Sequence, residues 1–177
     1  MIDTESYGRA LFELAAETDT DTMVRQQLHL VCDVLREEPR YILLLDTPAI
    51  SEEDKQALIQ QAFGSMERYL SNFLHILVAK KIVFSLHDCA AAYDRCYDEA
   101  HNLLRATAIT AQPMSEKQKA ALQSRLSELT KKTVSLETRI DPSLVGGIRL
   151  RYGGVQLDDS IQSKLAQFKR SLTETTL

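Results

Sequence analysis

Apolar residues in the first 105 positions recur every three or four residues, which is the spacing that places side chains on one face of a helix. Tyr7, Leu11 and Leu14 form the first such strip, and Asp3 or Thr4 can cap its helix. Five more segments follow with short connections: 21–38, the short apolar piece 41–45, 51–64, 69–78 and about 86–105. The pattern predicts a bundle of six helices.

The helix at 69–78 is the most apolar of the six. Its apolar residues surround much of its circumference, which is typical of the central member of a bundle. They are Tyr69, Phe73, Leu74, Ile76, Leu77 and Val78.

The first helix also pairs large with small apolar residues, since Ala10 lies beside Tyr7, Leu11 and Leu14. Such relief lets a helix of another protein pack closely in a groove. The same strip could instead be buried inside the bundle. The spacing alone leaves both alternatives open.

After position 105 the pattern changes to the alternation of apolar and polar residues that indicates strands. Residues 106–111 and 133–140 alternate in this way, and the capping-box sequence Ser115 to Gln118 starts a helix between them. The order β-α-β indicates a small sheet backed by a helix.

A hairpin follows, because the segments 147–152 and 155–158 alternate and are separated by Gly153 and Gly154, which can take the positive φ angles of a two-residue turn. Asp141 and Pro142 mark the turn before it, with Gly146 and Gly147 at its start. Asp159 can cap a closing helix, whose apolar residues Ile161, Leu165, Phe168 and Leu172 share one face. The predicted fold is α+β: a six-helix bundle at 1–105, then a small α/β domain with a β-hairpin at 106–177.

Charge is distributed unevenly over these two domains. Residues 1–105 hold 10 Lys and Arg against 18 Asp and Glu, whereas residues 106–177 hold 11 against 7. Such asymmetry suggests that the domains face different partners. The basic half lacks a dense cationic stripe with interleaved aromatics, so we expect no nucleic-acid partner. No run approaches the roughly 18 apolar residues of a membrane span, and the acidic start is unlike a signal or transit peptide, so a reducing cytoplasm is expected.

Candidate reaction chemistry is sparse. The three cysteines, Cys32, Cys89 and Cys96, lack the spacing of zinc sites. Neither glycine pair is followed by the Lys-Ser/Thr and helix of a phosphate loop. The one enzymatic alternative is a metal-dependent hydrolase that uses His87, Cys89 and Asp158. These residues do not form part of a known catalytic motif. We expect a protein that is not an enzyme and needs no cofactor or metal.

The sequence Asp-Pro-Ser-Leu-Val-Gly-Gly-Ile at 141–148, the second glycine pair, the Asp-Asp-Ser-Ile helix start at 158–161 and the closing helix together resemble the end of the F-type ATP synthase delta subunits. Mitochondria call this family the oligomycin sensitivity-conferral protein. Residues 7–15, Tyr-Gly-Arg-Ala-Leu-Phe-Glu-Leu-Ala, resemble the opening helix of the family. The resemblance therefore covers the whole chain.

The resemblance implies a non-catalytic stator subunit of a bacterial proton-translocating ATP synthase, present in a single copy on the cytoplasmic face of the cell membrane without inserting into it. In the family the first and fifth helices bind the N-terminal helix of an alpha subunit, and the C-terminal domain contacts the b subunits of the peripheral stalk. Tyr7, Ala10 and Leu11 match the first-helix motif, and Phe73, Leu74, Leu77 and Val78 match the fifth.

Two positions depart from the family pattern. Gly8 stands where alanine is usual, and a mid-helix glycine costs up to about 1 kcal/mol, so a looser groove edge is expected. Ile82 stands where the family commonly has arginine. The coupling ion, proton or sodium, stays open. The alternative function is a free-standing helical adaptor that binds an unrelated amphipathic helix.

Overall fold

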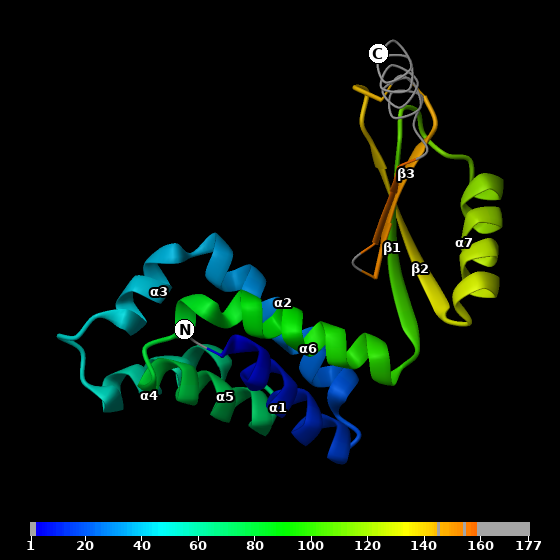
Figure 1. Ribbon diagram of the computed structural model, residues 1–177. Helices are drawn as coiled ribbons and strands as arrows, with labels where there is room; N and C mark the ends of the chain where they lie inside the picture. Colours follow the sequence, from blue (N-terminus) through cyan, green and yellow to red (C-terminus); the bar gives the residue numbers. More distant parts are fainter. Residues whose placement is uncertain (1–2, 145, 154, 159–177) are drawn as a thin grey trace, which may run out of the picture. The chain divides into compact units, whose positions relative to one another are not determined.

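Residues 3–144, 146–153 and 155–158 are those that the computed structural model of this chain describes. The chain divides into two units, Met1–Glu99 and Ala100–Leu177, called unit 1 and unit 2 below (Figure 1). Unit 1 is helical and unit 2 contains a sheet, so the predicted α+β class is confirmed.

Six α-helices and one 3-10 turn make up the described part of unit 1. Local caps fix two of their starts, since the side chains of Asp3 and Ser51 each accept a hydrogen bond of 3.1 Å from the backbone N–H three residues on. The elements are α1 (Thr4–Glu17), α2 (Asp21–Glu37), α3 (Pro39–Asp46), α4 (Glu52–Phe63), α5 (Arg68–Ala79), η1 (Val83–Ser85) and α6 (Leu86–Ala100).

The core of unit 1 is built from the predicted apolar strips. On α2, Val24, Leu28, Val31 and Leu35 are all buried, as their spacing predicts. Tyr93 of α6 is fully buried, and its hydroxyl donates a 2.8 Å hydrogen bond to the backbone carbonyl of Asp21. This bond satisfies the polar end of a ring that is otherwise in apolar surroundings.

The last helix is shorter than predicted. We expected it to reach Arg105, but α6 ends at Ala100, and Asn102 turns the chain with a φ of 51°. Residues 103–105 then pair with residues 133–135 of a parallel strand. The sheet therefore gains backbone hydrogen bonds from three residues that were assigned to the helix.

Unit 2 is a four-stranded mixed sheet with one described helix. Its elements are β1 (Leu103–Thr110), α7 (Glu116–Thr130), β2 (Thr133–Ile140), β3 (Ile148–Tyr152) and β4 (Val155–Asp158). The strand order is β2-β1-β3-β4, with β1 and β2 parallel and the other neighbours antiparallel. The helix α7 forms the crossover between the parallel strands, and the predicted capping box of Ser115 and Gln118 is present at its start.

Both predicted turns around the hairpin are confirmed in unit 2. The Asp141 side chain accepts a 3.0 Å hydrogen bond from the N–H of Ser143, which makes a tight turn. Tyr152 pairs with Val155, so the turn between β3 and β4 has two residues, and Gly153 has a φ of 52° there. Gly154, the cap Asp159 and the closing helix at 161–172 lie outside the described residues.

Candidate interaction surfaces

The helix α1 has one buried face and one exposed face. Leu11 is 2% exposed and is accompanied in the interior by Gly8, Phe12 and Ala15. On the adjacent flank, Ala10 is exposed, Tyr7 is half-buried, and Leu14 is 45% exposed. The strip predicted from spacing is therefore split between the core and the surface.

The helix α6 covers the side of α1 that is opposite this exposed flank. A Cβ added at Gly8 would lie 2.3 Å from the carbonyl oxygen of Cys89 and 2.6 Å from the Cβ of Ala92, both on α6. The Phe12 and Tyr93 rings meet edge to face at 5.5 Å. The missing side chain at Gly8 lets α6 approach closely. The looser groove edge expected from this glycine stays a prediction.

The helix α5 packs beside α1 on its other side (Figure 1). Four of its predicted interface residues are buried in unit 1, namely Phe73, Leu74, Leu77 and Val78. By contrast Ile76 is 47% exposed, and Tyr69, seven residues earlier on the same flank, is half-buried. Ile76 was not among the predicted interface residues. The signal that could have identified it is its apolar side chain outside the stripe of Phe73 and Leu77.

We call Tyr7, Ala10, Leu14, Tyr69 and Ile76 the α1/α5 surface. Its apolar side chains stand on two helices that pack against each other. The other predicted interface residues, Leu11 of α1 with Phe73, Leu74, Leu77 and Val78 of α5, are buried in unit 1. An exposed apolar surface over a rigid core is suited to receiving an apolar helix face.

An apolar hollow lies on another part of unit 1, between α2, α3 and α4. It has a volume of about 570 Å³, and Glu38 and Arg40 stand at its edge. Two of its lining residues pack together, since the Tyr41 ring meets Phe63 edge to face at 6.1 Å. Its apolar lining includes Leu30, Val34, Tyr41, Leu44, Phe63 and Met66, and we call it the α2/α3/α4 groove.

Three residues considered for metal or enzyme chemistry are either buried or paired, namely Cys32, Cys89 and Asp158. Cys89 is fully buried and burial raises the pKa of its thiol to about 11, while the pKa of Cys32 is raised to about 12 for the same reason. The Asp158 carboxylate accepts a 3.2 Å contact from Arg149. Within residues 3–144, 146–153 and 155–158, no group of three or more His, Cys, Asp or Glu could hold a metal ion.

Comparison with solved structures first gives the class of fold. The chain superposes on a chain of the Toxoplasma gondii mitochondrial ATP synthase hexamer with a TM-score of 0.76 and 22% identity, covering 98% of each chain. The two-unit α+β fold is therefore one that occurs in ATP synthases.

Sequence comparison then gives the family. The model of the family described as "ATP synthase delta (OSCP) subunit" matches residues 4–172. The ATP synthase subunit delta of a Geobacillus species is 32% identical over 172 residues, or 97% of each chain, and that of Moorella thermoacetica is 34% identical over 159 residues, or 90% of this chain and 89% of that one.

The chain belongs to the ATP synthase delta (OSCP) subunit family, as the resemblance at its two ends predicted. This is a family of peripheral-stalk subunits of rotary ATP synthases, which couple ATP synthesis to ion transport. None of the helices in the described part of the chain has the length and apolar content to cross a bilayer.

Proposed function

We propose that this protein is a non-catalytic stator subunit of a bacterial F-type proton-translocating ATP synthase. In this role it links the catalytic head to the b subunits of the peripheral stalk at the cytoplasmic face of the cell membrane. One copy acts per complex, and the six helices of unit 1 work as one bundle. It transmits force by binding alone, and needs no cofactor of its own.

The observation that carries this proposal is the exposed apolar row on α1, beside α5, in a chain of this family. Leu14 and Ile76 are each close to half exposed, although both are large and apolar. In the proposal they contact the apolar face of the N-terminal helix of an alpha subunit, with Tyr7, Ala10 and Tyr69 between them. Burial of large side chains in a desolvated groove supplies most of the affinity of such contacts.

Titration calorimetry of the full chain with a peptide copying the N-terminal helix of the cognate alpha subunit tests this proposal. Leu14→Asp and Ile76→Asp should each weaken binding by at least about 2 kcal/mol, or roughly thirtyfold, if these residues are hot spots. Leu43→Asp is the matched control, because Leu43 is an exposed leucine of α3 at 68%. Equal weakening of binding by all three variants would contradict the proposed α1/α5 surface, and so would unchanged binding in all three.

The alternative function is a free-standing adaptor that binds an unrelated amphipathic helix. The α2/α3/α4 groove favours it, because this apolar hollow of about 570 Å³ lies away from the predicted alpha-subunit contacts. Co-purification separates the two functions. A stator subunit brings alpha and b chains with it, whereas an adaptor brings neither.

A further inference from the structure

The α2/α3/α4 groove has the size and lining of a small-molecule site. Leu30 is 55% exposed, and Val34 and Leu44 are each 38% exposed, although all three are large and apolar. They line the same hollow of about 570 Å³, which falls within the range of roughly 300–1,000 Å³ for ligand pockets. Exposed apolar side chains that gather around one hollow indicate a binding site, whereas scattered ones do not.

The described side chains that form the hollow leave no hydrogen-bond donor free away from its edge. The hydroxyl of Tyr41 already donates a 2.9 Å hydrogen bond to the backbone carbonyl of Leu58. The other lining side chains, apart from Glu38 and Arg40 at the edge, are hydrocarbon or thioether groups. The part of a ligand that enters the hollow must therefore be apolar, because a polar group there would lose its hydrogen bonds to water.

The edge of the groove carries two opposite charges, two residues apart in sequence. Glu38 joins α2 to α3 and Arg40 lies in the first turn of α3, and both residues are exposed. Pro39 between them is the first residue of α3, and its fixed φ angle makes this corner stiff. Among the described residues, neither Glu38 nor Arg40 has an ion-pair partner. The edge can therefore offer one ligand both a site for an anion and a site for a cation.

We infer that the α2/α3/α4 groove binds a single-chain amphiphile with a zwitterionic head, of the lysophospholipid class. The acyl chain fills the hollow. The Arg40 guanidinium donates hydrogen bonds to the phosphate, and the Glu38 carboxylate accepts them from the ammonium group, which only two carbons and an oxygen separate from the phosphate. The inference does not rest on the stator function, because the groove shares no residue with the α1/α5 surface.

A fatty acid is less suited to this groove than a zwitterion. Its carboxylate could bind Arg40, but it would then lie near the like charge of Glu38, which costs affinity. An uncharged head would leave both side chains in water and gain nothing from them. Both charges of the edge are used only when the head carries both signs.

An amphipathic helix is the competing occupant. A helix of three turns is about 16 Å long and 10 Å across, so it displaces roughly 1,200 Å³. This is about twice the volume of the hollow. A helix would therefore lie across the hollow without filling it, whereas an acyl chain is thin enough to enter.

The test is a methyl NMR titration of the full chain with lauroyl lysophosphatidylethanolamine, kept below its critical micelle concentration. We expect saturable shifts at Leu30, Val34 and Leu44, with little change at Leu14 and Ile76 of the α1/α5 surface. Dodecyl maltoside, which has a similar chain and an uncharged head, should bind at least about fivefold more weakly. Two fewer CH2 groups in the acyl chain should weaken binding about three- to fifteenfold, because each fully buried CH2 contributes roughly fourfold.

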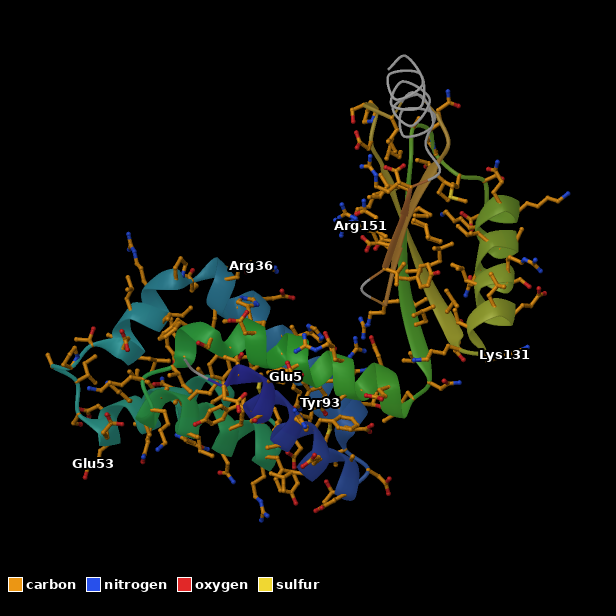
Figure 2. All side chains as sticks on the ribbon, viewed as in Figure 1. Glu5, Arg36, Glu53, Tyr93, Lys131 and Arg151 are labelled. Carbon is orange, nitrogen blue, oxygen red and sulfur yellow. The ribbon has the colours of Figure 1, made fainter. Side chains whose placement is uncertain are left out.

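Four variants separate the roles of the hollow and the edge. Val34→Asp should weaken binding at least about tenfold, because it places a charge in the apolar lining. Arg40→Gln and Glu38→Gln should each weaken binding of the zwitterion about threefold or more, and leave binding of dodecyl maltoside unchanged. Arg36→Gln is the matched control for Arg40, since Arg36 is an arginine of α2 at the surface of unit 1 that pairs with Asp33 and does not line the hollow (Figure 2).

Saturable binding at the groove that Val34→Asp, Arg40→Gln and Glu38→Gln weaken and Arg36→Gln does not would support the inference. Absence of binding by the monomeric amphiphile would overturn it, as would shifts of equal size at the α1/α5 surface, which indicate adhesion to any apolar patch. Equal affinity for dodecyl maltoside would overturn the role of the two charges. Saturable shifts of Leu30 and Val34 with the alpha-subunit peptide, but not with the amphiphile, would assign the groove to a helix instead.

Discussion

Replacing Gly8 with alanine should destabilise unit 1, although alanine is the better helix former. In an open helix the change would gain about 1 kcal/mol. Here the new Cβ would lie 2.3 Å from the carbonyl oxygen of Cys89 and 2.9 Å from the backbone nitrogen of Tyr93. Backbone atoms cannot rotate away, so α6 must shift, and forcing an extra carbon into a packed core costs about 1–3 kcal/mol or more.

We therefore expect Gly8→Ala to lower the free energy of unfolding by about 1–2 kcal/mol, because an overpacking cost near the upper end of its range exceeds the gain in helix propensity. Urea unfolding of the full chain, followed by far-UV circular dichroism, measures it. Ala10→Gly is the matched control, because Ala10 is exposed on the same helix and should lose about 1 kcal/mol through propensity alone. If Gly8→Ala raised the free energy of unfolding by as much as Ala10→Gly lowered it, the close packing of α1 and α6 would be refuted.

Three further predictions concern other contacts. Burial raises the pKa of Asp94, but hydrogen bonds from Arg25 at 2.6 Å and from His29 outweigh burial and lower this pKa. The ionised carboxylate therefore stabilises the fold above the unfolded pKa of about 3.9, and this stabilisation is lost as the pH falls through the lower folded pKa. Asp94→Asn should thus cost about 1–2 kcal/mol at pH 7, and urea unfolding at decreasing pH should show the difference shrinking below about pH 4. Ser115→Ala should cost about 1 kcal/mol by removing the cap of α7, measured by the same unfolding assay and by faster hydrogen exchange in the first turn of α7. Gly153→Ala should cost about 1–2 kcal/mol through its φ of 52° alone, because its Cβ has room 3.7 Å from the nearest atom; Gly153→Asn, which tolerates this backbone better, should cost less in the same assay.

Much of the fold could be predicted from the sequence because its signals are local. Asp3, Ser51 and Ser115 each cap a helix with a side chain that bonds three residues ahead. The strand at 133–140 and the two-residue hairpin turn were likewise marked by alternation and by glycine. Such features are decided within a few residues, before any long-range packing forms.

The boundary between the units could not be predicted in the same way. Residues 103–105, Leu-Leu-Arg, suit a helix as well as a strand, and their pairing with residues 133–135 decides between the two. Pairing across about 30 residues leaves no local signature. A tertiary contact therefore overrode the helix propensity of the segment.

The candidate surface was found in part from sequence. Spacing placed Leu11 and Leu14 on one strip. Side chains three residues apart still differ in direction by about 60° around the helix, however, and only packing shows that Leu11 is inside and Leu14 outside. The same reason hid Ile76 among the buried residues of α5.

The most direct test of the stator account is a methyl NMR titration of the full chain with the alpha-subunit peptide. The account predicts saturable shifts at the methyl groups of Ala10, Leu14 and Ile76, with little change at Leu30 and Val34. Shifts confined to Leu30 and Val34 would move the docking site to the α2/α3/α4 groove and favour the adaptor function. A folded chain with no shifts at high peptide concentration would contradict alpha-subunit binding.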